Sequence, residues 1–149
     1  MRDDGKAIRY AQSAILPYAP ERMFDLVADV ERYPEFLQEY RQVRIRARDG
    51  DILHVDQVIG LAFIELTLSA TATLRRPDSI IVRSRQELLG DLEVRWGFAL
   101  DASSTRVEFR MELTPPSRFA AGIAGYLLTK SAARTLDAFA RRARRIYGA

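Results

Sequence analysis

Side chains that commonly carry chemistry are few in this sequence and widely spaced. His54 is the only histidine, cysteine is absent, and no set of carboxylates has the spacing of a metal site. His54 alternates with Leu53 and Val55, so we expect it on the solvent face of a strand, without the partner that a catalytic base needs. A glycine-rich phosphate loop and a Gly-x-Ser-x-Gly turn are also missing. The sequence therefore favours a protein without metal, cofactor or thiol chemistry.

Two other sets of polar residues are candidates for acid–base chemistry. Glu108 and Glu112 alternate with arginines, a pattern typical of ion pairs on the wet face of a sheet. Ser84 and Gln57 are the best candidates for polar groups among inward-facing apolar rows. Two such groups are a sparse set for catalysis inside an apolar core, so we expect a protein that is not an enzyme.

Composition places these residues in one domain. The chain has 149 residues, of which 48% are hydrophobic, enough for one substantial core. Residues 1–7 lack the apolar centre of a signal peptide and are expected to form a disordered tail. No run of about 18 apolar residues is present, which predicts no membrane-spanning helix. Together with the absence of cysteine, these features favour a cytoplasmic protein.

Alternating hydrophobicity predicts a sheet preceded by a short helical insert. Ile8–Leu16 reads as a first strand, and Pro20 and Asp29 are expected to start two short helices, Asp29 as an N-cap. From residue 43 onward the apolar period is two, with turns at 49–51, 77–79 and 101–104 and a break at Gly60. The rows expected to face inward are Val43, Ile45 and Ala47; Ala62, Ile64, Leu66, Leu68, Ala70, Ala72 and Leu74; Leu92, Val94, Trp96, Phe98 and Leu100; and Val107, Phe109, Met111 and Leu113.

The last segment, 117–147, is predicted to be one long helix with an N-cap at Ser117 and an end at Gly148. One stripe is small or apolar throughout: Gly122, Gly125, Leu128, Thr129, Ala132, Ala133, Leu136, Ala140, Ala143 and Tyr147. The opposite face is apolar only in its first half, at Phe119, Ile123, Tyr126 and Leu127. A helix of this kind is suited to covering a sheet with its second half.

These elements predict an α+β fold in which a curved antiparallel sheet of about seven strands wraps around the long C-terminal helix, with two short helices between strands one and two. Gly122 and Gly125 are expected opposite the aromatic and sulfur side chains of the sheet. Small residues there either allow close packing or leave space for a ligand. Both interpretations stay open at this stage.

Four segments match the pattern of a known family: LPYAPERMFDLVADVERYPEFL at 16–37, LEVRWGF at 92–98, TRVEFRMEL at 105–113 and AFARRARRIYG at 138–148. In these segments and in its order of elements, the chain resembles the helix-grip fold of START-like (polyketide cyclase/lipid transport) domains. More narrowly, it resembles the coenzyme Q-binding START-domain family, which also includes the ribosome association toxin. Two segments near the expected tunnel mouth, 38–40 and 87–91, depart from that family's usual pattern.

The resemblance implies a hydrophobic tunnel between sheet and helix that holds a polyprenyl quinone such as ubiquinone, or a related lipid, as a ligand rather than a cofactor. Tyr33 and Phe36 are expected either to pack the insert on the sheet or to form a lid. The residues expected to contact the ligand are Tyr33, Phe36, Leu37, Leu66, Leu68, Trp96, Phe98, Phe109, Met111, Gly122, Gly125 and Leu128.

Three functions remain as hypotheses. A non-catalytic lipid carrier would load at the inner membrane, with Phe119, Ile123, Tyr126 and Leu127 as the docking face. The alternative is a protein that binds the large ribosomal subunit, without DNA as a partner, through a basic surface formed by Arg44, Arg46, Arg48, Arg141, Arg144 and Arg145. The third hypothesis is a polyketide cyclase or aromatase. The first is preferred because the inward rows are almost entirely apolar.

Overall fold

The computed structural model describes residues 7–62 and 64–148. The tail expected over residues 1–7 therefore lies outside the described residues, apart from Ala7. The elements in chain order are β1 (Ile8–Leu16), α1 (Pro20–Ala28), the 3-10 helix η1 (Val30–Glu35), β2 (Tyr40–Asp49), β3 (Ile52–Leu61), β4 (Ile64–Arg75), β5 (Ser79–Gln86), β6 (Gly90–Asp101), β7 (Ser104–Thr114) and α2 (Arg118–Tyr147).

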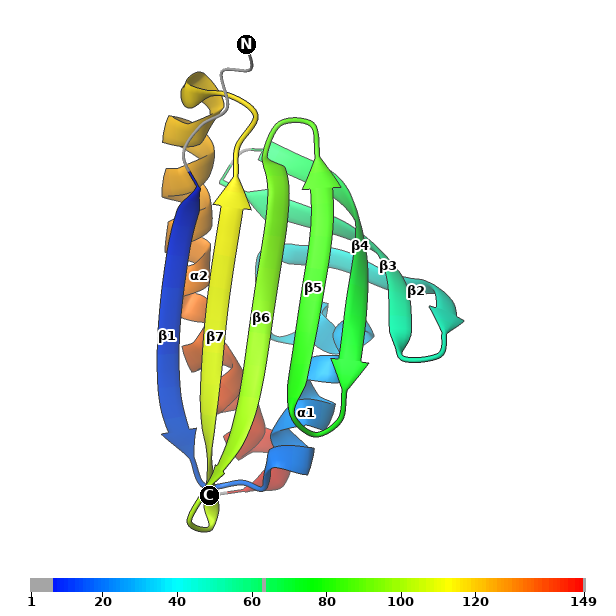
Figure 1. The fold of residues 1–149 in the computed structure, drawn as a ribbon, viewed down its shortest axis with the longest axis vertical. Helices are drawn as coiled ribbons and strands as arrows, with labels where there is room; N and C mark the ends of the chain where they lie inside the picture. Colours follow the sequence, from blue (N-terminus) through cyan, green and yellow to red (C-terminus); the bar gives the residue numbers. More distant parts are fainter. Residues whose placement is uncertain (1–6, 63, 149) are drawn as a thin grey trace.

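The strands form one antiparallel sheet in the order β1-β7-β6-β5-β4-β3-β2. β1 pairs with the last strand, β7, so that Ile8 lies opposite Leu113 and Leu16 opposite Thr105. Figure 1 shows β1, β7, β6 and β5 nearly upright while β2 and β3 turn across them. β4 pairs with β5 only from Ala70 onward. The first half of β4 stays paired with β3, and these two strands can therefore bend away from β5 together. The predicted antiparallel α+β fold is confirmed, and the sheet is strongly curved.

α2 runs along the concave side of this sheet, while α1 and η1 cover one end (Figure 1). Ser117 caps α2 as predicted, its hydroxyl accepting a hydrogen bond from the Ala120 amide at 3.1 Å. Pro115 and Pro116 separate α2 from β7, and Gly148, with φ +89°, ends the helix. The helix-grip arrangement predicted from the sequence is therefore confirmed.

The second half of α2 holds the helix on the rest of the molecule. Phe139, 1% exposed, has its ring centre 4.9 Å from that of Trp96 and 5.3 Å from that of Tyr33. At the helix end, the Tyr147 hydroxyl donates to the carbonyl oxygen of Arg22 at 2.9 Å, and the Tyr18 hydroxyl donates to that of Gly148 at 2.6 Å. Aromatic packing and terminal hydrogen bonds thus fix this half in place.

Local predictions for the insert and the first hairpin need correction. Asp29 does not cap a helix with its side chain; its carboxylate pairs with Arg32 at 3.3 Å, and η1 is a 3-10 helix that contains Pro34. Gly60 does not break β3, which continues to Leu61. Ala62 lies in the following turn with φ +55° rather than in an inward row.

Two inward rows are also shorter than predicted. The β2–β3 register shifts between Ile45 and Ala47, so the alternation ends there and Ala47 is exposed. Leu100 is 70% exposed because it lies next to the turn between β6 and β7, where the hairpin projects from the core. On α2, Thr129 and Ala133 are exposed, because the buried stripe runs through Leu136 and Phe139 instead.

Replacing Phe139 with alanine should lower the free energy of unfolding by about 3–5 kcal/mol, because a fully buried aromatic ring leaves a cavity against Trp96 and Tyr33. Urea unfolding followed by circular dichroism measures this change. Tyr126→Ala, which removes an aromatic ring from the exposed side of the same helix, is the control and should change the value by less than about 0.5 kcal/mol. Similar losses in both variants would contradict the anchoring role of Phe139.

Candidate ligand cavity

A cavity lies between the concave face of the sheet and α2, with η1 at one end. Its volume is about 100 Å³, the space of a few water molecules or one small ring. Most of the lining is aliphatic or aromatic, contributed by β2 to β7, the insert and α2. An apolar cavity with a few polar groups is the usual form of a small-molecule site. A space for a ligand between sheet and helix, one of the two alternatives of the sequence analysis, therefore exists, although large side chains narrow it.

Eight of the twelve residues predicted to contact a ligand line this cavity. They are Tyr33, Leu37, Leu66, Leu68, Trp96, Phe109, Met111 and Leu128. Ser84 and Gln57, the two polar candidates of the sequence analysis, also line it. Leu89, in the turn between β5 and β6, lines it from the segment expected near the tunnel mouth.

Phe36 and Phe98 do not line the cavity, contrary to expectation. Phe98 packs edge-on against Phe24 of α1, with ring centres 5.8 Å apart. The ring centres of Phe36 and Phe139 are 5.0 Å apart, and the guanidinium of Arg142, on α2, lies 5.0 Å from the Phe36 ring centre. Both side chains consequently belong to the contact between the insert and the body of the fold.

Gly122 and Gly125 also lie outside the cavity. Gly122 is exposed, and a Cβ there would meet nothing within 4 Å. At Gly125 a Cβ would lie 2.6 Å from Cδ1 of Ile8, so this glycine lets α2 approach β1 closely. Of the two interpretations of these small residues, close packing is correct at Gly125. The cavity lies further along α2, beside Leu128 and Ala132.

Phe139 is the largest of the α2 lining residues that the sequence analysis missed. The predicted stripe of small or apolar residues left it out, although Phe139 follows Leu136 by three positions and Ala132 by seven. Helical spacing alone was therefore enough to place it on the buried side. Because Phe139 fills the middle of the concave sheet, it reduces the space that the glycine and alanine content suggests.

The buried Tyr33 and the half-buried Tyr40 differ in their hydrogen bonding. The Tyr33 hydroxyl donates to the Val27 carbonyl oxygen, and burial raises the pKa of Tyr33 well above its usual value. Burial also raises the pKa of Tyr40 to about 12, so this hydroxyl keeps its proton and can donate a hydrogen bond. Among the described residues, the Tyr40 hydroxyl, the Gln57 amide and the Ser84 hydroxyl have no hydrogen-bond partner. They are free to bind a polar atom of a ligand.

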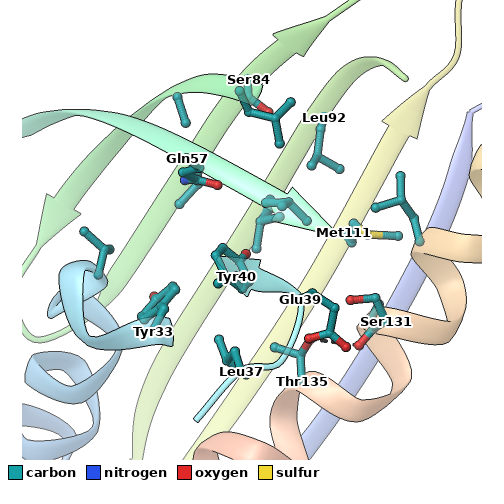
Figure 2. A pocket seen from close by; sticks show the side chains of 18 of the residues that line it. Tyr33, Leu37, Glu39, Tyr40, Gln57, Ser84, Leu92, Met111, Ser131 and Thr135 are labelled. Carbon is teal, nitrogen blue, oxygen red and sulfur yellow. Dashed lines mark hydrogen bonds between the residues drawn. The ribbon is translucent and has the colours of Figure 1, made fainter. Parts of the chain in front are cut away.

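A second polar group lies where the cavity meets the surface. Figure 2 shows Glu39, Ser131 and Thr135 side by side, Glu39 from the segment before β2 and the other two from α2. The Glu39 side chain is only 15% exposed, and its Oε1 accepts a hydrogen bond from Nη2 of Arg134 at 2.9 Å. Glu39 and Leu61 line both the inner cavity and an outer groove, which marks this place as the cavity mouth.

The predicted docking face is exposed on the first half of α2. Phe119, Ile123 and Tyr126 are 84%, 54% and 63% exposed, and the insert lies at the other end of the sheet (Figure 1). Leu127, which was expected on the same face, is instead half-buried and packs against the core. Lys130 lies 5.3 Å from the centre of the Tyr126 ring, so a cation borders the apolar side chains.

The predicted basic surface consists of separate regions. Arg44 and Arg46 share Asp56, at 3.9 and 3.4 Å, on the outer face of the sheet. On α2, Arg141 pairs with Asp137 one turn away. Arg48, Arg144 and Arg145 are exposed and form no ion pair with a described residue. Three of these six arginines thus pair with two acidic side chains, which offset two of the six positive charges.

Other chemistry has little support in the part of the chain that the structure describes. His54 is half-buried on β3 between the buried Leu53 and Val55 and has no hydrogen-bond partner there. Over the same residues, no three His, Asp or Glu side chains lie close enough to hold a metal ion. None of the described helices is long and apolar enough to cross a membrane.

Comparisons with known proteins agree with this geometry. Residues 16–140 match the family model described as polyketide cyclase/dehydrase and lipid transport. The ribosome association toxin RatA of Pseudomonas aeruginosa is 26% identical over 138 residues, covering 92% of this chain and 96% of the toxin. That of Vibrio cholerae is 28% identical over 139 residues, covering 93% and 96%.

Two solved structures illustrate the likeness in fold. The Zhui aromatase/cyclase from Streptomyces sp. R1128 superposes with a TM-score of 0.84 at 16% identity, covering 95% of this chain and 96% of that protein. An 18 kDa protein from Caulobacter crescentus has a TM-score of 0.73 at 26% identity, covering 95% and 99%. Together, these neighbours have the fold of a sheet wrapped around a C-terminal helix.

Proposed function

The chain belongs to the polyketide cyclase/dehydrase and lipid transport family, and from this premise we propose that it is a non-catalytic carrier of a hydrophobic ligand. The observation that supports the proposal most directly is the apolar cavity between the sheet and α2, with Tyr40, Gln57 and Ser84 available for hydrogen bonds. Hydrophobic burial would provide the affinity, and the polar groups would orient the ligand.

A polyprenyl quinone or related lipid is the ligand class that we propose. The cavity, at about 100 Å³, matches a ring head rather than a whole prenyl chain. The head would lie against Trp96 and Phe109, within reach of Tyr40. The chain would leave through the mouth at Leu61 and follow the groove beside Leu127. The bound head would then be removed from water while the tail stays near the surface.

The carrier proposal excludes a chemical step because the cavity lacks a matched acid and base. Tyr40 holds its proton, since its pKa is raised to about 12. The carboxylate at the mouth, Glu39, is paired with Arg134. The remaining polar side chains that line the cavity are hydroxyls and one amide, and among the described residues none of them hydrogen-bonds to a carboxylate. Binding and release are therefore the proposed activity.

Loading would take place at the surface of the inner membrane, with the protein otherwise in the cytoplasm. Phe119, Ile123 and Tyr126 would enter the boundary between headgroups and acyl chains. Lys130 would contact anionic headgroups beside them. This face adjoins the groove that leads to the cavity mouth, because Tyr126 and Lys130 line that groove. A ligand could thus pass from the bilayer to the cavity along this groove.

Ala132→Leu should reduce the ligand that co-purifies with the protein by about tenfold or more, because the added atoms occupy the cavity beside Leu128. Native mass spectrometry and lipid extraction measure the bound ligand. Ala133→Leu is the matched control, since the neighbouring alanine is exposed. It should retain the ligand. A wild-type protein that carries no lipid, or equal loss in both folded variants, would contradict the carrier proposal.

The double variant Phe119→Asp, Ile123→Asp should lose binding to anionic vesicles, because two carboxylates would replace the side chains that enter the bilayer. Flotation with phosphatidylglycerol vesicles measures binding. Leu100→Asp is the control, since Leu100 is 70% exposed at the β6–β7 turn, away from the start of α2. Unchanged flotation of the double variant would remove the membrane role of this face.

A second candidate function, association with the large ribosomal subunit, is favoured by the names of the RatA relatives. Arg144 and Arg145 in the last turn of α2 would contact phosphates, being exposed and without an acidic partner among the described residues. The other arginines of the predicted basic surface have acidic partners, Asp56 for Arg44 and Arg46 and Asp137 for Arg141, apart from the exposed Arg48. Because few of these arginines are left without an acidic partner, we rank ribosome association below lipid carriage.

Co-sedimentation with purified large subunits over a salt series tests the second candidate. If it is correct, wild-type protein should pellet with the subunit. The double variant Arg144→Gln, Arg145→Gln should show a weaker salt dependence of the binding constant, by an amount that corresponds to about two phosphate contacts. Arg83→Gln with Arg95→Gln is a control of equal charge, because both arginines pair with Glu93. The absence of co-sedimentation even at low salt would end this candidate.

A further inference from the structure

The polar groups at the cavity mouth have hydrogen-bonding capacity that the protein itself does not use. Glu39 Oε1 accepts from Arg134, whereas no described residue donates to its second oxygen, Oε2. A carboxylate has about four acceptor sites, and this side chain is only 15% exposed. Glu39 Oε2 is not among the fully buried unpaired side-chain atoms of the described residues, so water can reach it, and a ligand O–H can take the place of that water.

The neighbouring side chains do not supply that donor. The Thr135 hydroxyl, which could have donated to Glu39, instead donates to the carbonyl oxygen of Ser131 at 3.0 Å. Its oxygen therefore remains as an acceptor beside the carboxylate. Figure 2 shows Glu39, Ser131 and Thr135 gathered at this end of the cavity. The Ser131 hydroxyl can donate or accept, but among the described residues no hydrogen bond from it to Glu39 is present. The Glu39 carboxylate and the Thr135 oxygen therefore remain as acceptors for a ligand that brings an O–H or N–H group.

The deeper part of the cavity has the opposite character. Tyr40, which directly follows Glu39, has a hydroxyl that keeps its proton, and Gln57 and Ser84 can also donate. The walls between these groups include the faces of Trp96 and Phe109. A flat ring with a hydroxyl toward the mouth and an apolar or acceptor edge toward the interior matches this arrangement.

We infer that the cavity selects a hydroxylated ring, a phenol or the reduced quinol head of a prenylated quinone, whose O–H donates to the Glu39 carboxylate. This inference rests on the proposed carrier function and specifies the ligand further. A fully oxidised quinone has only acceptors, so it would leave Glu39 Oε2 without a donor. The carrier would therefore hold the reduced form more tightly than the oxidised form.

Phenol and toluene are suitable probes, because they have nearly the same shape and differ by a hydroxyl in place of a methyl group. The single tryptophan, Trp96, lines the cavity, and its one indole N–H resonance reports binding in NMR titrations. Glu39→Leu should weaken phenol binding by about tenfold, as expected for loss of a hydrogen bond to a charged group. Toluene affinity should change by less than about twofold.

Arg134→Met provides the control for structural effects. This variant breaks the same ion pair but keeps the carboxylate, so its preference for phenol over toluene should equal or exceed that of the wild type. If Arg134→Met loses the preference as Glu39→Leu does, or if Glu39→Leu weakens both probes equally, Glu39 is not the acceptor and the inference is wrong. If the wild type binds toluene and Glu39→Leu leaves phenol binding unchanged, the inference fails while the carrier function stands. Binding of neither probe to the wild type would overturn both.

Discussion

Contact between Phe139 and Trp96 sets the distance between α2 and the sheet, and the cavity depends on that distance. The ring centres are 4.9 Å apart, so the helix cannot settle further into the concave face. Tyr33 and Phe36 pack on the same phenylalanine from the insert. One side chain therefore connects the three layers of the molecule. The remaining space lies between Phe139 and the mouth, where the lining of α2 becomes smaller at Ala132 and Leu128.

Electrostatics on the outer face have a different role from those at the mouth. On the sheet, Arg83 and Arg95 pair with Glu93, and Arg9 pairs with Glu112. Such exposed pairs contribute little to stability, but they neutralise a surface that would otherwise be strongly cationic. Glu39 is more enclosed, so its unmatched oxygen weighs more heavily in what the cavity accepts.

The sequence was sufficient for the fold because its periodicities are clear and are reinforced by turns and caps. Ser117 and Gly148 mark the true ends of α2, and the alternation of β7 gives its buried row from Val107 to Leu113. The site was predicted less well, since lining a cavity depends on how strands curve and how a helix is rotated. Composition suggested space at Gly125, whereas the helix rotation directs that glycine to Ile8.

Polar lining residues were harder still to predict. Glu39 and Thr135 are ordinary surface residue types, and only the crossing of the segment before β2 over α2 brings them to one cavity. Register shifts act similarly: the extra residue at Arg46 ends, in the structure, an alternation that continues in the sequence through Ala47. These outcomes depend on contacts between distant segments, which local patterns do not contain.

Pairing of β1 with β7 also has a consequence for how the chain reaches this state. Ile8 meets Leu113, so the first strand gains a partner only after roughly a hundred further residues have been synthesised. Until then the hydrogen-bonding edge of β1 and the apolar side of the nascent sheet are open to other chains. Completion of the sheet is consequently a late event in biogenesis, and chaperone dependence would be governed by the time between synthesis of the first strand and synthesis of the last.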